Sequence, residues 1–226
     1  AVRDPWGFRP LCIGMLPSGG HAVASETGAL QTLGCEAIRD VKPGEVVSLS
    51  NNALKVMQAV KPEQPSAMCV FEHIYFARPD QTWDGINVHH VRQRLGEELA
   101  REVISGLSHG LTDENGQFAD VVIPVPDSSV PAAIGFSHVS GIPYNDGFIK
   151  NRYVGRTFIE PTDSLRKRGV ALKFNVINEN VRDKRVVMID DSIVRGNTTG
   201  PLIKLLKNAG AKEVHVAITC PPIAHP

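Results

Sequence analysis

The chain has 226 residues, of which 42% are apolar and 21% charged, and its 24 basic and 24 acidic residues cancel to a formal net charge of zero. This balance excludes an intrinsically disordered chain. No stretch approaches the roughly 18–20 consecutive apolar residues that a membrane-spanning helix needs. Zero net charge argues against general binding to nucleic acids or anionic membranes. The length predicts roughly one and a half domains.

The first sixty residues are predicted to be all strand, joined by tight turns. Two pairs of short apolar runs flank clusters of turn residues, which is typical of β-hairpins. The paired runs lie at residues 11–16 with 21–25, and at 45–49 with 53–60. A stretch with two prolines follows at residues 61–66 and reads as a linker. We therefore expect a first domain at residues 1–62 and a second at 63–226.

The second domain is predicted to open with an amphipathic helix and to continue as an α/β fold. Residues 86–105 place an apolar side chain every three or four positions, as on one face of a helix. From residue 120 onward, strands alternate with helices, which implies a parallel sheet. The expected strands are 121–125, 148–149, 185–189 and 213–219, and the expected helices are 130–139 and 198–208. Ligands of such sheets bind at the carboxyl ends of the strands.

Residues 186–200 form the most informative run in the chain. An apolar strand ends at Asp190 and Asp191, and a loop of mostly small residues then opens a helix. The free N–H groups of the helix start suit a phosphate, whereas the carboxylates suit ribose hydroxyls or Mg²⁺. The run therefore predicts a sugar-phosphate site rather than a plain strand end with an N-cap. The loop and helix-start residues of this site are Ser192, Arg195, Gly196, Asn197 and Thr198.

These residues resemble the signature of type I phosphoribosyltransferases. Three further segments narrow the resemblance to the glutamine phosphoribosylpyrophosphate amidotransferase family, also called amidophosphoribosyltransferases. Residues 69–80 are similar to its domain junction, 150–161 to its flexible active-site loop, and 1–14 to the later part of its glutaminase domain. The implied fold is a type I phosphoribosyltransferase domain, with a parallel sheet and flanking helices. Residues 1–62 would be the last part of an N-terminal-nucleophile (αββα) glutaminase domain, and the phosphoribosyltransferase domain would be truncated at its C-terminus.

The resemblance implies a pentosyltransferase of purine biosynthesis. Ammonia taken from glutamine displaces pyrophosphate from phosphoribosyl pyrophosphate, which gives 5-phosphoribosylamine in the first committed step. The family's glutaminase nucleophile is an N-terminal Cys, and we expect none in this chain, because every Cys here is internal. Purine nucleotides are the implied feedback inhibitors, and a homo-oligomer is the implied state of the full-length protein.

The resemblance also assigns roles to residues outside the strand-end run. It implies that Asp127, Ser128 and Ser129 form the pyrophosphate loop, with Ser128, Asp190 and Asp191 near Mg²⁺. Three cations, Lys150, Arg152 and Arg156, would belong to a lid that neutralises the leaving pyrophosphate. A solvated basic loop is the alternative for those cations.

Four widely spaced cysteines, Cys12, Cys35, Cys69 and Cys220, occur in the chain. With no secretory signal, they favour a reducing cytoplasm over a disulfide framework. Some relatives hold a [4Fe–4S] cluster through four cysteines, one of them at the position of Cys69. Cys69 is therefore either a cluster ligand of the full-length protein or a buried free thiol.

Two functions from other classes remain as alternatives. A phosphoribosyltransferase-like domain can act as a regulator that binds phosphoribosyl pyrophosphate without catalysis, although the zero net charge and the intact 150–161 loop weigh against that role. An enzyme that uses a purine or pyrimidine base as acceptor is the other alternative. The junction at residues 69–80 and the glutaminase-like segment argue against it.

Overall fold

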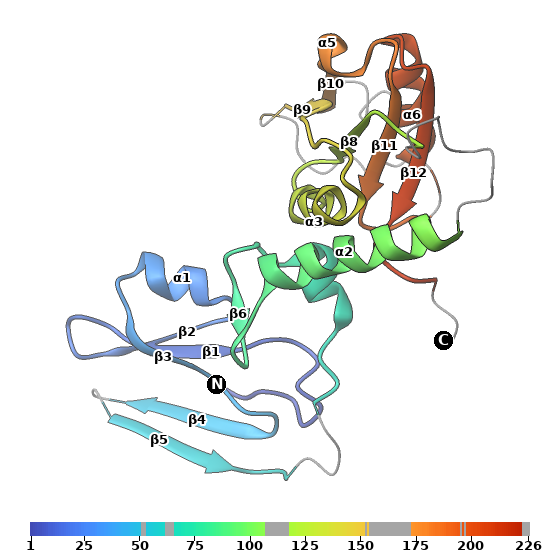
Figure 1. The fold of residues 1–226 in the computed structure, drawn as a ribbon. Coiled ribbons are helices and arrows are strands. Elements are labelled where there is room, and N and C mark those ends of the chain that lie inside the picture. Colours follow the sequence, from blue (N-terminus) through green and yellow to red (C-terminus); the bar gives the residue numbers. More distant parts are fainter. Residues whose placement is uncertain are drawn as a thin grey trace. The chain divides into compact units, whose positions relative to one another are not determined.

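The computed structural model describes residues 1–50, 53–61, 66–106, 118–151, 153, 173–194, 196 and 198–222. The chain divides into two compact units, Ala1–Val91 and Arg92–Pro226. The elements of both units are labelled in Figure 1. Among the described helices, none combines the length and apolar character needed to cross a bilayer.

The first unit consists mainly of short antiparallel strands. Its elements are β1 (Cys12–Met15), β2 (His21–Ala24), α1 (Thr27–Thr32), β3 (Glu36–Asp40), β4 (Glu45–Ser50), β5 (Ala53–Gln58), the π-helical turn η1 (Glu72–Phe76), β6 (Thr82–Trp83) and β7 (Ile86–Asn87). The strands form a three-stranded sheet in the order β2-β1-β3 and two hairpins, β4-β5 and β6-β7. Both predicted hairpins, β1-β2 and β4-β5, are confirmed as antiparallel pairs.

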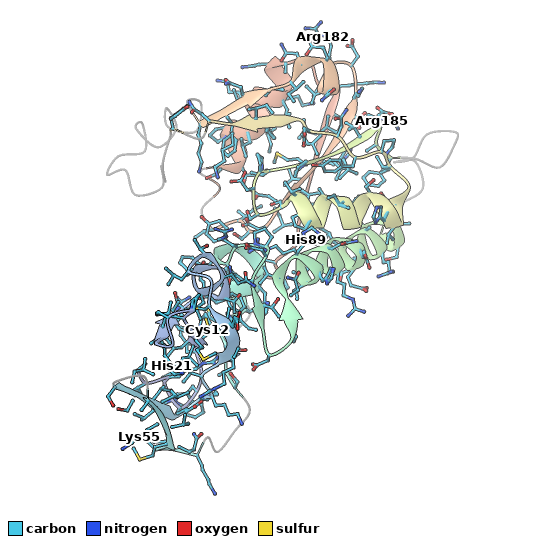
Figure 2. All side chains as sticks on the ribbon, turned by 90° about the vertical axis from the view of Figure 1, so that its left-hand side faces the viewer. Cys12, His21, Lys55, His89, Arg182 and Arg185 are labelled. Atoms are coloured by element: carbon cyan, nitrogen blue, oxygen red, sulfur yellow. The ribbon has the colours of Figure 1, made fainter. Side chains whose placement is uncertain are left out.

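The central strand β1 contributes to two small cores because its side chains alternate across the sheet. Cys12 packs with Leu30 and Cys35, whereas the next residue, Ile13, packs with Val41 and other apolar side chains. Figure 2 labels Cys12 within this unit. Its thiol donates to a backbone oxygen of β2, and burial raises the pKa of Cys12 to about 12, as expected of an inert core thiol.

The prediction that the first sixty residues are all strand is wrong at α1. The helix has only six residues, too few to show a helical period in the sequence. Its start is held by Gln81, whose side-chain oxygen accepts from Thr27 Oγ1 at 2.7 Å and from the Gly28 N–H at 3.0 Å. Leu30 anchors the helix in the core. The helix therefore depends on a residue more than fifty positions away.

The first compact unit extends beyond the domain boundary expected at residue 63. After the linker, the Ala67 N–H donates to the Trp6 carbonyl at 2.7 Å, and the Cys69 N–H donates to the Phe8 carbonyl at 3.0 Å. Farther along, Gln81 holds α1 as described above. These long-range contacts tie residues 66–91 to the first unit, and the two units divide after Val91.

The second unit is built around a parallel sheet. Its elements are the main part of α2 (Val88–Gly106), β8 (Val121–Pro124), α3 (Val130–Ser140), β9 (Phe148–Lys150), β10 (Phe174–Val176), α5 (Asn178–Val181), β11 (Arg185–Asp190), α6 (Thr199–Asn208) and β12 (Glu213–Ile218). The parallel strands lie in the order β12-β11-β8, and β9 pairs with β10 in a separate antiparallel sheet. The parallel α/β fold predicted from the sequence is confirmed.

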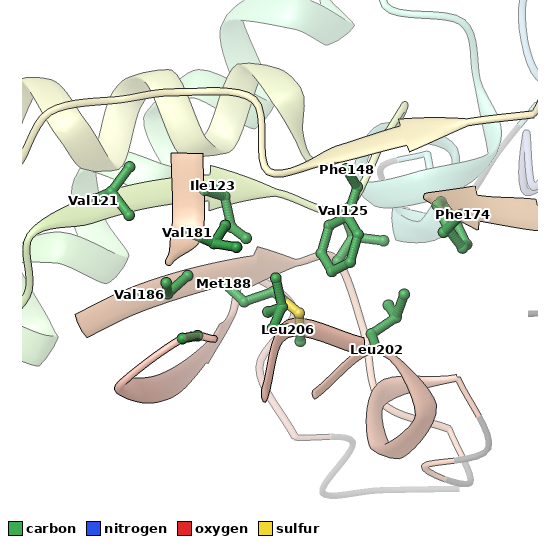
Figure 3. Close-up of a cluster of buried hydrophobic side chains, with 11 residues drawn as sticks. Val121, Ile123, Val125, Phe148, Phe174, Val181, Val186, Met188, Leu202 and Leu206 are labelled. Atoms are coloured by element: carbon green, nitrogen blue, oxygen red, sulfur yellow. The ribbon is translucent and has the colours of Figure 1, made fainter. Parts of the chain in front are cut away.

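The parallel strands are continuously apolar because both of their faces are covered. Val186 and Met188 of β11 pack with Leu202 and Leu206 of α6 on one face, as Figure 3 shows. The alternate residues of β11 pack on the other face with Phe136 of α3 and with residues of α2. At the start of β11, two N–H groups of the Arg185 side chain (labelled in Figure 2) donate hydrogen bonds to the Asp120 carboxylate at 2.7 and 3.2 Å.

Candidate functional site

The carboxyl ends of the three parallel strands meet at one edge of the sheet. The Val125 N–H, just after β8, donates to the Ile189 carbonyl at 2.8 Å. Just after β12, the Thr219 N–H donates to the Asp190 carbonyl at 3.1 Å. The segments that follow β8, β11 and β12 therefore leave the sheet side by side, at the edge where the sequence predicts ligand binding.

Two adjacent carboxylates lie at this edge, and each residue is only 7% exposed. Ser128 Oγ donates to Asp191 Oδ2 at 2.5 Å, and Ser192 Oγ donates to Asp191 Oδ1 at 2.7 Å. The Asp191 N–H donates to Asp190 Oδ1 at 2.9 Å. Residues from two loops, 63 positions apart in the chain, thus converge on one carboxylate.

The protonation of Asp190 differs from that of an ordinary carboxyl group. Burial and the neighbouring Asp191 charge raise the pKa of Asp190 to about 7, and the Asp191 N–H and the Ser129 hydroxyl oppose that rise. Ser129 is 1% exposed, and its Oγ has no partner of regular hydrogen-bond geometry among the described residues. The described residues therefore offer few groups that stabilise a negative charge on Asp190. Such a carboxyl group is common in sites where a bound ligand supplies the missing interactions.

The loop between β8 and α3 carries the predicted pyrophosphate residues Asp127, Ser128 and Ser129. Its Pro126–Asp127 peptide bond is cis. The exposed Asp127 carboxylate forms an ion pair with Nζ of Lys150, the last residue of β9. The structure thus brings the first predicted lid cation to the pyrophosphate loop. The other two lid cations, Arg152 and Arg156, lie outside the described residues, and Tyr153 is 99% exposed.

The predicted phosphate loop connects β11 to α6. Gly196 has a φ of +67°, a conformation that favours glycine, and the Gly200 N–H donates to its carbonyl at 3.2 Å. Thr198 is the N-cap residue of α6, but its side chain makes no hydrogen bond to the helix. Thr198 is exposed to solvent. Arg195 and Asn197 fall outside the described residues. The described part of the loop leads from the two carboxylates to the start of α6 at Thr199.

Comparison with known families agrees with this arrangement. The phosphoribosyl transferase domain family matches residues 94–225, which is more than half of the chain. This chain belongs to that family. The match covers every strand of the parallel sheet and the loops that carry the predicted phosphoribosyl pyrophosphate site.

Individual relatives extend the similarity to the whole chain. The chain is 49% identical over 224 residues to an amidophosphoribosyltransferase of Archaeoglobus fulgidus, and 50% identical over 225 residues to one of Methanothermobacter thermautotrophicus. It covers 46% and 44% of these relatives, so it spans about half their length. Among solved structures, the chain is similar to a glutamine phosphoribosylpyrophosphate amidotransferase from B. subtilis complexed with ADP and GMP. The TM-score is 0.80 and the sequence identity 48%, and the match covers 99% of this chain and 46% of the B. subtilis chain.

The two predicted cofactors, Mg²⁺ and an iron–sulfur cluster, fit the described residues unequally. Asp190, Asp191 and the Ser128 hydroxyl offer hard oxygen ligands, and Mg²⁺ typically uses one or two carboxylates together with substrate phosphates. Mg²⁺ therefore fits. Among the described residues, no group of three or more His, Cys, Asp or Glu side chains could hold a metal ion. The described residues therefore do not supply the four-ligand set that an iron–sulfur cluster at Cys69 would need.

Two residues near the site were not predicted from the sequence. Arg92 of α2 is 3% exposed; burial lowers the pKa of its guanidinium, and the Asp191 charge opposes that shift. Arg92 lies four residues after Val88 and three before Leu95, and therefore on the apolar face of the predicted helix. A charged residue on that face was the sequence feature that could have identified it. Cys220 follows β12, and its N–H donates to the Asp191 carbonyl at 2.9 Å. Burial and the Asp191 charge raise the pKa of its thiol.

Proposed function

We propose that this chain carries the phosphoribosyl pyrophosphate site of an amidophosphoribosyltransferase. The observation that carries the proposal is the convergence of Asp190, Asp191 and Ser128 at one strand edge, beside the start of α6. The names of the relatives, which match this chain over its whole length at 49–50% identity, support the same activity. Ammonia would replace pyrophosphate at C1 of phosphoribosyl pyrophosphate to give 5-phosphoribosylamine.

In this proposal, the 5′-phosphate binds at the loop of residues 192–198. Backbone N–H groups at the start of α6 have no partner within the helix and, with the helix dipole, favour an anion. The Thr198 hydroxyl makes no capping bond and remains able to donate to phosphate. Arg195 and Asn197 would add further donors. The phosphate would thereby fix the ribose with its hydroxyls toward the two carboxylates.

Asp190 and Asp191 would accept hydrogen bonds from the two ribose hydroxyls and, together with Ser128, contribute ligands to Mg²⁺. When bound, Mg²⁺ would neutralise part of the charge on the diphosphate. Asp190 would lose its proton as the cation binds, since the cation offsets the burial that raises its pKa. Asp191 would keep its orientation through the hydroxyls of Ser128 and Ser192.

The pyrophosphate would leave between the 127–129 loop and the lid. Nitrogen forms a bond to C1, the C1–O bond breaks, and the electron pair departs with pyrophosphate while the new amine loses a proton to water. Lys150, Arg152 and Arg156 would stabilise the charge that develops on the leaving oxygen. Before substrate binds, Asp127 pairs with Lys150. The incoming diphosphate would compete with Asp127 for this cation.

The remaining assignments extend the proposal to the whole protein. Residues 1–62 would be the last part of a glutaminase domain that supplies ammonia from glutamine. Purine nucleotides would act as feedback inhibitors, in line with the ADP and GMP bound to the B. subtilis relative. The full-length protein would form a homo-oligomer. All four cysteines are free thiols, as a reducing cytoplasm would maintain them.

A regulator that binds phosphoribosyl pyrophosphate without catalysis is the alternative. It is not favoured, because the relatives that match the whole chain are named as amidophosphoribosyltransferases. The base-accepting enzymes are disfavoured for the same reason, since this similarity includes the segment before the phosphoribosyl transferase domain. The experiment below separates binding from catalysis and therefore distinguishes the enzyme from the regulator.

The test supplies the chain with phosphoribosyl pyrophosphate, Mg²⁺ and ammonium chloride at alkaline pH, and measures both the binding of phosphoribosyl pyrophosphate and the release of pyrophosphate. We expect release that requires Mg²⁺ and ammonia. The double variant Asp190→Asn/Asp191→Asn should lose it, whereas Asp183→Asn, an exposed aspartate of the same unit, should retain it. Binding without pyrophosphate release would favour the regulator, and normal release by the double variant would refute the assigned carboxylates.

A further inference from the structure

Asp127 is an acidic residue in the loop that is assigned to the polyanionic leaving group. It directly precedes Ser128, whose hydroxyl donates to Asp191. A carboxylate only accepts hydrogen bonds and repels phosphate oxygens, so its direct contact with pyrophosphate is unfavourable. The side chain of Asp127 is 75% exposed, and in the part of the chain that the structure describes its carboxylate bonds only to Nζ of Lys150. Asp127 therefore requires a role other than binding the diphosphate.

The backbone of Lys150 is held in place by the core of the second unit. Lys150 ends β9, and Phe148 of that strand belongs to the same apolar cluster as Val125, which precedes the pyrophosphate loop (Figure 3). Lys150 lies opposite Phe174 of β10, and the rings of Phe148 and Phe174 meet edge to face at 6.0 Å. The fold therefore fixes both backbones between which the ion pair forms. The Lys150 side chain is 30% exposed, so its ammonium group is accessible to an anion from solvent.

A second ion pair of this unit shows how a structural pair differs. The Asp120 carboxylate accepts from two N–H groups of the Arg185 side chain and from the Arg185 backbone N–H. This pair connects the starts of β8 and β11, at the edge of the sheet opposite to the site. Asp127 instead bonds a single ammonium group at the edge where the site lies. An exposed pair with one such contact is weak, so a competing anion can replace the carboxylate.

We propose that Asp127 is a positioning residue that weakens pyrophosphate binding, because its carboxylate occupies Lys150 whenever no diphosphate is bound. This inference rests on the proposed function of the site. The diphosphate of the substrate displaces the carboxylate when it binds, and Asp127 pairs with the ammonium group again as pyrophosphate leaves. Asp127 therefore lowers the affinity for substrate and product alike and speeds the release of the product. It acts through Lys150 and does not touch the substrate.

The experiment measures pyrophosphate binding to the 226-residue chain by calorimetry, with and without Mg²⁺. Asp127→Asn should tighten binding by about two- to fivefold, which corresponds to the strength of an exposed ion pair. Asp183→Asn removes the same charge just before β11, at the opposite edge of the sheet, and should bind like the wild-type chain. Unchanged binding by Asp127→Asn would overturn the inference. Weaker binding would make Asp127 a ligand of the diphosphate or of its Mg²⁺ and would overturn it as well.

The variant Lys150→Gln tests whether Asp127 acts through this cation. Lys150→Gln alone should bind pyrophosphate more weakly than the wild-type chain. In the double variant Asp127→Asn/Lys150→Gln, the loss of the carboxylate should no longer tighten binding, since no cation remains for which the two anions compete. Equal tightening with and without Lys150 would mean that Asp127 merely repels the ligand, and would overturn the inference.

Steady-state kinetics separate this role from a merely structural one. In the pyrophosphate-release assay, Asp127→Asn should lower the KM for phosphoribosyl pyrophosphate without raising kcat, because the more tightly bound product leaves more slowly. A raised KM or a raised kcat would contradict the inference. Failure of the wild-type chain to bind phosphoribosyl pyrophosphate and pyrophosphate would overturn the proposed function and, with it, this inference. If the wild-type chain binds both, the outcomes for Asp127→Asn test the inference alone.

Discussion

The two units of the molecule bury polar side chains in different ways. In the first unit, Arg3 is 4% exposed, and its guanidinium donates to three backbone carbonyls at 2.8–3.2 Å, including that of Val41. Glu45 is 2% exposed and accepts from Arg39 at 2.7 Å and from the Lys42 N–H at 2.6 Å. These two groups are held by protein partners and fasten loops to the small sheets. Asp40 Oδ1 and Trp83 Nε1 of the same unit are buried without a hydrogen-bond partner among the described residues, but each is a single atom and not part of a cluster of carboxylates.

In the second unit, the buried polar groups gather at one strand edge and are poorly balanced. Asp190 and Asp191 are adjacent carboxylates, and the Ser129 hydroxyl lacks a regular partner among the described residues. The comparison teaches that burial of polar residues alone does not mark a site. A buried group whose partners satisfy it supports the fold, whereas an under-compensated cluster at strand ends indicates a ligand.

The largest effect is expected where two helices of the second unit touch. Gly96→Val should destabilise this unit by more than about 3 kcal/mol, because the new side chain would overlap the Ala132 carbonyl and force the helices apart. Gly106→Ala on the same helix has open space and should be neutral or slightly stabilising. Urea unfolding of both variants measures the difference. Similar midpoints would show that the close helix contact is not required.

A gain in stability is expected at the strand edge. The fold raises the pKa of Asp190 from 3.8 to about 7. Between these two pH values, Asp190 is protonated in the folded state but ionised in the unfolded state. Wild-type stability should fall as the pH rises from about 4 to about 7. Asp190→Asn removes this dependence and should stabilise the substrate-free and Mg²⁺-free chain at pH 8 by on the order of 2–3 kcal/mol.

Urea midpoints at pH 5 and pH 8 test this prediction. The advantage of Asp190→Asn over wild type should be larger at pH 8 than at pH 5, while pyrophosphate release is lost. Such a trade of stability for activity is typical of functional sites. An unchanged or lower midpoint at pH 8 would show that Asp190 is well compensated and that the contrast between the two units is weaker than the structure indicates.

In the first unit, the corresponding change should only destabilise. Gln81 is completely buried and accepts from Thr27 and Gly28 at the start of α1. Gln81→Leu leaves these donors without their partner and should cost about 2 kcal/mol. Gln31→Leu, at an exposed glutamine of α1, is the control, and circular dichroism with thermal unfolding is the measurement. A stabilised Gln81→Leu variant would contradict the assignment of structural burial to this unit.

The smallest effects are expected for ion pairs at the surface of the second unit. Hydrogen bonds from Arg185 lower the pKa of Asp120 in the folded protein. The pair therefore contributes to stability above the ordinary carboxyl pKa. This contribution is lost as the pH falls through the pKa that Asp120 has in the folded state. Asp120→Asn should cost about 1 kcal/mol at pH 7, since solvent screens a partly exposed pair. Glu98→Gln, which loses only a surface pair with Arg101, should cost about 0.3 kcal/mol. Equal destabilisation of the two variants at pH 7 would refute the ranking.

The sequence predicted the second unit better than the first. The expected helices and parallel strands appear within one or two residues of the expected bounds, because the longer helices carry a helical apolar pattern and the strands a continuous apolar run. In the first unit, α1 and η1 were not predicted, since a helical element of five or six residues spans less than two turns and shows no readable 3.6-residue period. The three-residue strand β10 and the four-residue helix α5 were also missed.

The sequence by itself determined the parallel α/β class and the run from Asp190 to Thr198, because strand, carboxylates and helix start are contiguous in the chain. Only the tertiary structure decided that Ser128 bonds Asp191, that Arg92 is buried, and that the first unit extends to Val91. Each of these depends on residues distant in the chain. Local patterns specify which faces are apolar, but they do not specify which distant polar groups meet once those faces pack.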